Sequence, residues 1–256
     1  MAAAGGGRRR ASNRAWAQSD NWETLRQELF RRRICDLGLR IKGSPVEPSI
    51  RQLEQELSAK GVDYVPAFYL SDAWGCPDQV PTIGIPFYLA NPVLGRIEKE
   101  QTGDLEDSPT VMQLLRHETG HAINYAFRLW EDPSWRETFG PFFQPYREVF
   151  HPNPWSRRFV RHIWSCPNGY TYAQKHPDDD FAETFAVWLT PRSGWRRKYR
   201  DWPALQKLRY VDRLMRKIGD RQPTCRGGKL VEPVSELTMP LAEYYRRRIK
   251  GYGRTG

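Results

Sequence analysis

Residues 108–130 read SPTVMQLLRHETGHAINYAFRLW, and they contain the strongest structural signal in the chain. Ser108 and Pro109 are typical of a helix start, with serine as the N-cap and proline at the first helical position. Apolar residues then recur at helical spacing as far as Leu129. We therefore predict one amphipathic helix from Ser108 to about Trp130.

The middle of this helix carries His117-Glu118-Thr119-Gly120-His121. Two histidines four residues apart lie on one helix face, one turn apart, so their rings can share a metal ion. Glu118 then lies where it can reach a water on that metal. This H-E-x-x-H arrangement is typical of zinc hydrolases and indicates a zinc-dependent peptidase. The alternative is a pair of hydrogen-bonded histidines on a half-buried helix.

A catalytic zinc site uses three protein ligands and keeps a further position for water, so a third ligand is needed. Pro177 and Asp178 indicate a second helix start, and Thr190-Pro191 indicate its end. On this helix Asp179 and Glu183 share a face, so one could bind metal while the other accepts the ring N–H of a ligand histidine. Spacing alone does not assign these two roles. For Asp178, Asp179 and Asp180 the alternative is N-capping and a solvated acidic turn.

His117-Glu118-x-x-His121, then Tyr172, then the run from Asp179 to Ala186 (DDFAETFA) resemble the gluzincin-type metallopeptidases. Bacterial zinc-binding metallopeptidases with a P-x-E-D-x-A-E-x-x-A segment have a similar pattern, and the protease domain of anthrax toxin lethal factor has a similar layout. The resemblance covers roughly residues 108–190. It implies Asp179 as the third zinc ligand, Glu183 as the partner of a ligand histidine, and Tyr172 as a donor to the transition-state oxyanion. Because aspartate stands where the family usually has glutamate, Glu183 stays open as an alternative ligand.

The implied fold is α+β and zincin-like, predominantly helical, with a small mixed sheet and an edge strand beside the active-site helix. In the corresponding mechanism, zinc lowers the pKa of its bound water to about 7, and Glu118 acts as the general base. Glu118 takes the proton as the water attacks a peptide carbonyl and passes it to the leaving amine.

The rest of the chain is organised around this metal-site core of residues 108–190. We expect residues 1–18 to be a flexible basic tail and residues 19–256 to be a single catalytic domain. The long segment 131–170 is expected to form a lid or cleft wall. Residues 83–89, next to Pro86, are the candidate edge strand for pairing with an extended substrate. The further elements that we expect are helices at 20–33, 47–60, 203–217 and 240–250, strands at 34–41, 64–70 and 82–90, and a loop at 98–107.

The chain has 40 lysines and arginines against 30 acidic residues, a net charge of +10. This charge favours a peptide or protein substrate that is acidic, or nucleic acid, although no nucleic-acid-binding motif is present. No run of 18 apolar residues predicts a membrane span, and the four scattered cysteines are expected to be free thiols in the cytoplasm. Two alternative functions remain: a protease that docks on nucleic acid through its arginine clusters, and a non-catalytic protein in which metal joins two helices. His176 or His151 as a fourth ligand would favour the latter.

Overall fold

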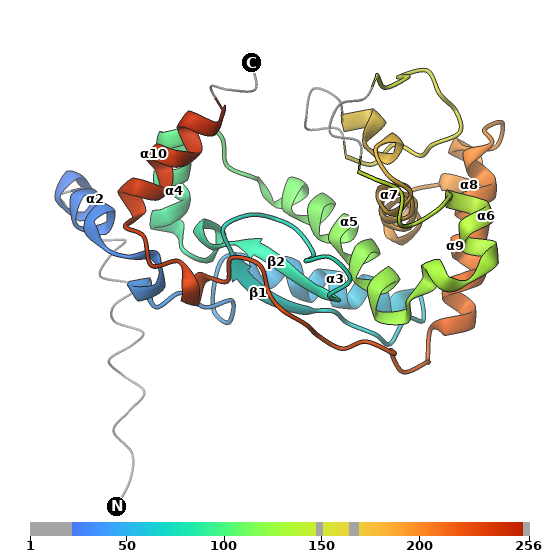
Figure 1. Cartoon of the computed structure of the whole chain (residues 1–256), viewed down its shortest axis with the longest axis horizontal. Coiled ribbons are helices and arrows are strands. Elements are labelled where there is room, and N and C mark those ends of the chain that lie inside the picture. The colour runs from blue at the N-terminus through green and yellow to red at the C-terminus, as the bar shows by residue number, and fades with distance from the viewer. Residues whose placement is uncertain (1–21, 147–150, 164–168, 253–256) are drawn as a thin grey trace, which may run out of the picture.

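The structure is a computed structural model that describes residues 22–146, 151–163 and 169–252 (Figure 1). The predicted tail of residues 1–18 and Cys166 lie outside the described residues. The described part is mostly helical and contains one small sheet, which confirms the α+β class and the predominance of helix.

The sheet consists of two parallel strands, β1 (Ala67–Ser71) and β2 (Thr82–Pro86), with Ala67 opposite Thr82. On its other edge β2 forms an antiparallel bridge, in which the backbone N–H of Gly84 donates to the carbonyl of Gly75 at 2.8 Å. A side chain at Gly84 would crowd this contact, because its Cβ would lie 3.2 Å from the Gly75 oxygen. A second single antiparallel bridge joins Ser71 of β1 to Pro233. The sheet is therefore a parallel pair with one isolated bridge on each strand, rather than the mixed sheet that we expected.

The prediction of a free edge strand over residues 83–89 is wrong in its extent. The strand ends at Pro86, and Phe87–Ala90 form a 3-10 helix. Both edges of β2 are in use, one by β1 and the other, at Gly84, by Gly75. The segment around Gly75, and not β2, therefore forms this rim of the sheet.

The described part of the chain contains nine α-helices. They are α2 (Trp22–Arg31), α3 (Glu47–Ala59), α4 (Pro92–Thr102), α5 (Ser108–Phe127), α6 (Pro133–Phe139), α7 (Pro177–Leu189), α8 (Trp195–Lys198), α9 (Ala204–Ile218) and α10 (Leu241–Tyr252). Helix α5 runs beside the sheet, and α3 lies against α5, where Arg116 donates two hydrogen bonds of 2.7 Å to Glu56 (Figure 1). Short 3-10 helices occur at Ile34–Leu37, Phe87–Ala90, Leu129–Glu131, Gly169–Gln174 and Val234–Glu236.

Three further predictions need correction. The expected strand over residues 34–41 is a 3-10 turn, Ile34–Leu37, which buries both of these apolar residues and ends at Gly38 with φ +66°. The expected loop over residues 98–107 begins only at Gly103, because α4 continues to Thr102. Helix α5 is capped by Asp107, whose side chain accepts from the N–H of Thr110, and not by Ser108.

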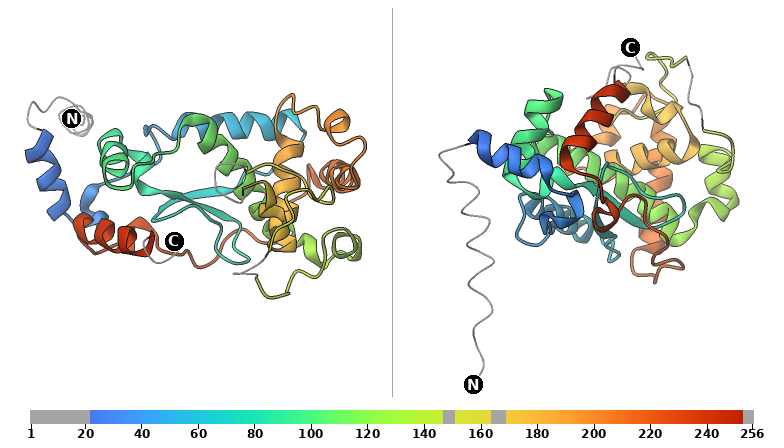
Figure 2. Two further views of the ribbon diagram at one scale, coloured as in Figure 1. Left: turned by 90° about the horizontal axis from the view of Figure 1, so that it is seen from above. Right: turned by 60° about the vertical axis from the view of Figure 1, so that its left-hand side comes forward.

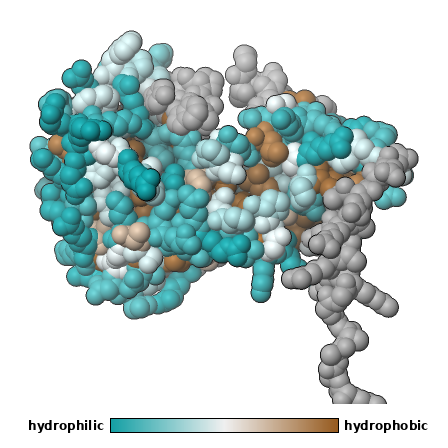
Figure 3. Space-filling view, turned by 180° about the vertical axis from the view of Figure 1, so that it is seen from behind, coloured by the Kyte–Doolittle hydropathy of each residue, from teal (hydrophilic) through white to brown (hydrophobic). Residues whose placement is uncertain are grey.

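The C-terminal part of the chain contacts first the end of α5 and then the N-terminal helices α2 and α4. The N–H groups of Thr224 and Cys225 donate to the carbonyl of Ala126 at the end of α5. Helix α10 then packs against α2 and α4, where Arg248 forms an ion pair of 2.9 Å with the buried Glu98 (Figure 2). The face opposite to that of Figure 1 is mostly hydrophilic, with smaller hydrophobic areas toward the N-terminal elements (Figure 3). No helix among the described residues has the length and apolar character needed to cross a membrane.

Candidate metal centre

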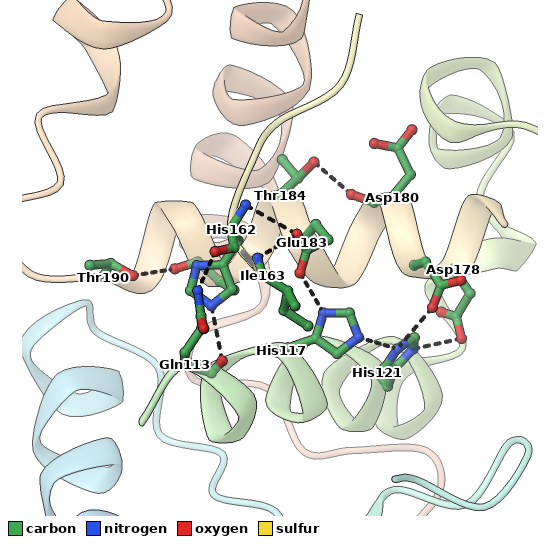
Figure 4. A network of polar contacts seen from close by, with 12 residues as sticks. Gln113, His117, His121, His162, Ile163, Asp178, Asp180, Glu183, Thr184 and Thr190 are labelled. Atoms are coloured by element: carbon green, nitrogen blue, oxygen red, sulfur yellow. Dashed lines mark hydrogen bonds and ion pairs between the residues drawn. The ribbon is translucent and has the colours of Figure 1, made fainter. Parts of the chain in front are cut away.

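Helices α5 and α7 cross in direct backbone contact, and this contact sets the geometry of the site. A Cβ atom on Gly120 would lie 2.6 Å from the Cα atom of Ala182 and 3.0 Å from its carbonyl oxygen. Only glycine at position 120 allows α7 to come this close. Figure 4 shows α7 lying over α5, with acidic side chains of α7 reaching toward the two histidines of α5.

His117 and His121 face one another from successive turns of α5. Their Nε2 atoms are 3.1 Å apart. The Nδ1 atom of His117 lies 2.7 Å from Oε1 of Glu183, and the Nδ1 atom of His121 lies 2.7 Å from Oδ2 of Asp178. A carboxylate at each Nδ1 holds a proton there, so the Nε2 atoms are the ones that can bind a metal.

Asp179 completes a set of three side chains that could hold a metal ion. Its Oδ1 atom lies 3.6 Å from Nε2 of His121, and donor atoms of His117, His121 and Asp179 all lie within 4.8 Å of one another. The other oxygen, Oδ2, is buried and has no hydrogen-bond partner among the described residues. Such an orphaned oxygen beside two imidazoles fits a divalent cation, which would compensate the cost of burying it.

Glu183 differs from Asp179 in that both of its carboxylate oxygens have hydrogen-bond partners. Its Oε1 atom contacts His117, while Oε2 accepts hydrogen bonds from the backbone N–H groups of His162, at 3.1 Å, and Ile163, at 3.0 Å. Both oxygens are therefore engaged, and the side chain is fully buried. This geometry favours Asp179 over Glu183 at the cation.

Asp178 is the functional residue that sequence reasoning missed. It is not a helix cap, because the side chain of His176 caps α7. Instead, the buried carboxylate of Asp178 accepts from His121, from Nδ2 of Asn124 at 2.6 Å and from the hydroxyl of Tyr125 at 2.6 Å. The three donors lie at positions 121, 124 and 125 of one helix face, and this spacing is a signal that the sequence already contained.

The solvated acidic turn is wrong for the other two aspartates as well. Asp179 faces the histidines, and the buried Asp180 forms an ion pair with Lys207 of α9. The physical reason is that the first turn of α7 is covered on several sides. Three consecutive helical residues then point about 100° apart, so each meets a different partner.

The histidine pair is strongly coupled. Burial, together with His121, lowers the pKa of His117 to about 3. Burial acts in the same direction on His121, but the charge and hydrogen bond of Asp178, with the charges of Glu118 and Asp179, raise its pKa to about 10. Burial raises the pKa of Asp179 to about 7. At neutral pH these values place one proton between the two Nε2 atoms, which a bound cation would displace.

The centre opens into a cleft of about 460 Å³. Glu118 lines it beside the histidines, with Cys76 and Trp74 from the rim near the sheet. The described part of segment 131–170 forms the opposite wall, as expected, through Phe142, Phe143, Gln144 and Tyr146. Three of the cysteines, Cys35, Cys76 and Cys225, are free thiols.

Tyr172 lines the same cleft, from the 3-10 helix Gly169–Gln174 that precedes α7. Its ring stands edge-on to His117, with the centroids 5.2 Å apart. Burial and the charge of Asp179 raise the pKa of the Tyr172 hydroxyl, so it keeps its proton at neutral pH and can donate a hydrogen bond.

The two histidines considered as a fourth ligand are placed differently. His176 lines the cleft, but its Nδ1 atom accepts from the N–H of Asp178 and its Nε2 atom lies 3.0 Å from the carbonyl of Gln144. His151 is exposed. Neither His176 nor His151 belongs to the group of possible metal ligands found among the described residues, which consists of His117, His121 and Asp179.

Comparisons of the chain with protein-family models, curated proteins and solved structures found no match.

Proposed function

We propose that this protein is a zinc-dependent peptidase with a zincin-like catalytic domain of the gluzincin type. One observation carries the proposal: His117, His121 and Asp179 converge from two helices on the wall of an open cleft, and Glu118 lines that cleft next to them. Three protein ligands beside an accessible space are typical of catalytic zinc sites, whereas structural sites are closed by four.

His117, His121 and Asp179 would hold the ion, and the donor set of two imidazoles and one carboxylate suits zinc. When bound, zinc supplies Lewis acidity that activates water and polarises a carbonyl. Glu118 takes a proton from the attacking water and returns it to the leaving amine. Tyr172 donates a hydrogen bond to the oxygen that becomes negative, a contact of the kind that contributes about 3–4 kcal/mol.

Asp178 and Glu183 support this chemistry without touching substrate. Each accepts a hydrogen bond from Nδ1 of a ligand histidine, which fixes the ring and makes Nε2 a stronger donor. Because both carboxylates sit on α7, the helix that provides Asp179 also orients the two rings of α5.

The substrate that suits the cleft is a neutral or basic peptide. Its lining includes Asp78, Glu118, Asp178 and Asp179, and no lysine or arginine among the described residues. One divalent cation would leave this group of four carboxylates negative. The positive charge of the whole chain therefore does not extend to the cleft, and the acidic substrate suggested by composition is disfavoured there.

Metal analysis of the purified protein beside its Glu118→Gln variant tests the proposal. We expect about one zinc per chain in both proteins, and hydrolysis of a peptide library by the unmodified protein alone. Glu54→Gln, the same change at an exposed position of α3 outside the cleft lining, should keep both zinc and hydrolysis. Zinc with no hydrolysis in the unmodified protein would favour the metal-joined binding protein. Equal hydrolysis by the Glu118→Gln variant would remove Glu118 from the mechanism.

A further inference from the structure

The positive charge of the chain is concentrated in two segments, residues 154–161 and 191–221. Together these segments hold fourteen lysines and arginines, three aspartates and no glutamate. The rest of the chain is nearly neutral, so the two segments carry all of the excess that gives the chain its net charge of +10. Both segments lie within the described residues, and the second one includes α8 and α9.

The two segments form one surface, which we call the basic surface, at the end of the molecule that contains α8 and α9 (Figure 1). The N–H of Ala204 donates to the carbonyl of Arg157 at 3.1 Å, and the N–H of Arg161 donates to the hydroxyl of Tyr199 at 3.1 Å. The guanidinium groups of Arg157 and Arg161 lie 5.8 Å and 5.0 Å from the ring centre of Trp202. These contacts hold the arginines of the first segment beside those of the second.

A cavity of about 540 Å³ lies between the two segments. Arg158 of the first segment and Arg213 of α9 both line it, and both side chains are exposed. Lys207 also lines the cavity, but it forms an ion pair with the buried Asp180. The lining includes one exposed carboxylate, Glu137. The two exposed arginines therefore line a hollow in the basic surface, where an anionic group can approach both of them.

An exposed aromatic ring accompanies these arginines. The side chain of Trp155 is 84% exposed, and the residue lies two positions before Arg157. Its backbone N–H donates to the side chain of Asn153 at 2.9 Å, which fixes the local turn. A large ring in water gains hydrophobic free energy when a ligand covers it. Stacking on such rings is how proteins bind the unpaired bases of single strands.

We propose that the basic surface binds single-stranded nucleic acid. Arg157, Arg158 and Arg213 bind phosphates of the strand, because the guanidinium group matches the geometry of phosphate. An unpaired base stacks on Trp155, whereas a base inside a duplex has no free face for it. Charge alone would also attract an anionic membrane. A membrane is broad and flat, however, whereas Arg158 and Arg213 line a hollow that a single strand can enter.

The test is fluorescence anisotropy of the full chain with a fluorescein-labelled strand of thymidines, and with the same strand paired to its complement. We expect the single strand to bind at least about fivefold more tightly than the duplex, because only its bases can stack. Three phosphate contacts give a slope of about −2 in the logarithm of affinity against the logarithm of salt concentration. The affinity should therefore fall about 20-fold between about 50 and 200 mM salt.

Variants locate the site, and none of them touches the metal centre. Replacing both Arg158 and Arg213 by alanine should weaken binding at least about fivefold and reduce the salt slope by about 1.4. The matched control replaces Arg31 and Arg246, which are exposed on α2 and α10, and should change the affinity less than about twofold. Trp155→Ala should weaken binding about five- to 150-fold, whereas Trp155→Phe keeps a ring for stacking and should lose less.

Three results would overturn the proposal. Equal losses from the two pairs of arginine substitutions would show that the strand is attracted by the net charge and not by this surface. Equal binding of the single strand and the duplex would remove the stacking of a base on Trp155. Binding of the chain to vesicles of phosphatidylserine and phosphatidylcholine, with no binding of the labelled strand, would assign the basic surface to a membrane instead.

Discussion

Replacement of Gly120 by alanine probes the contact on which the metal centre depends. The new methyl group would lie 2.6 Å from the Cα atom of Ala182, a backbone atom that no side-chain rotation can move. Carbon atoms in contact lie about 3.6 Å apart. Helix α7 would therefore have to move away from α5 by about 1 Å, and Asp179 and Glu183 would move with it.

The expected loss differs between stability and metal binding. Overpacking costs about 1–3 kcal/mol, but alanine gains about 1 kcal/mol over glycine within a helix. The net loss of unfolding free energy is then about 0–2 kcal/mol. Metal–ligand distances tolerate only about 0.2 Å. A shift of about 1 Å should therefore weaken zinc binding between about 10- and 100-fold, the range seen when the partners of metal ligands are disturbed.

Competition with a fluorescent zinc chelator measures the affinity, and urea unfolding measures the stability. Gly95→Ala in α4 is the matched control, because its Cβ would meet the flexible end of Leu105 at 3.4 Å and the backbone oxygen of Tyr88 at an ordinary contact distance of 3.8 Å. We expect this control to keep its zinc affinity. A folded Gly120→Ala protein that binds zinc as tightly as the unmodified chain would show that the helices do not set the positions of the ligands.

Three other predictions follow from the same contacts. Asp178→Asn removes the charge that faces His121 and should weaken zinc binding about 10- to 100-fold, as measured by the same competition; unchanged affinity would refute the positioning role. Raised pKa values mean that His121 and Asp179 hold protons below about 10 and about 7, so zinc affinity should fall as the pH falls below 7. At pH 6, calorimetry in buffers of different ionisation enthalpy measures the number of protons released when zinc binds. We expect about two protons per zinc from the unmodified protein and about one from the Asp179→Asn variant; the same number from both proteins would contradict this assignment. Lys207→Met leaves Asp180 buried without its counter-charge and should cost about 3–5 kcal/mol in urea unfolding, most of it restored by adding Asp180→Leu; a loss below about 1 kcal/mol would mean that the pair does not act as buried.

Local sequence signals predicted the helices that carry the site. Helical spacing and a proline near each start placed α5 and α7 to within a few residues at each end, and the spacing of His117 and His121 predicted their shared face. The mutual positions of the two helices were beyond such signals, since they depend on the contact between Gly120 and Ala182. Because the mutual position of the helices was unknown, the sequence left open whether Asp179 or Glu183 faces the metal.

The wrong predictions of a strand at residues 34–41 and of a helix cap at Asp178 have a common origin. Ile34 and Leu37 are apolar and resemble a strand, but their burial against the C-terminal segment, where Ile34 donates to the carbonyl of Met239, holds them in a 3-10 turn. Asp178 resembles a helix cap, but residues far away in the chain enclose it. In both cases a long-range contact decided a structure that local pattern left open.

The three consecutive aspartates at the start of α7 make the register of this helix a functional constraint. Asp178 points to His121, Asp179 to the cleft and Asp180 to Lys207. Insertion of a single residue into the helix between Asp180 and Glu183 would turn the acidic triplet by about 100° relative to the remainder of the helix and exchange all three partners at once. Lengthening the chain ahead of His176 would leave them in place. Related chains are therefore expected to vary in the length of the loop before this helix, but to keep the number of residues between the three aspartates and Glu183 unchanged.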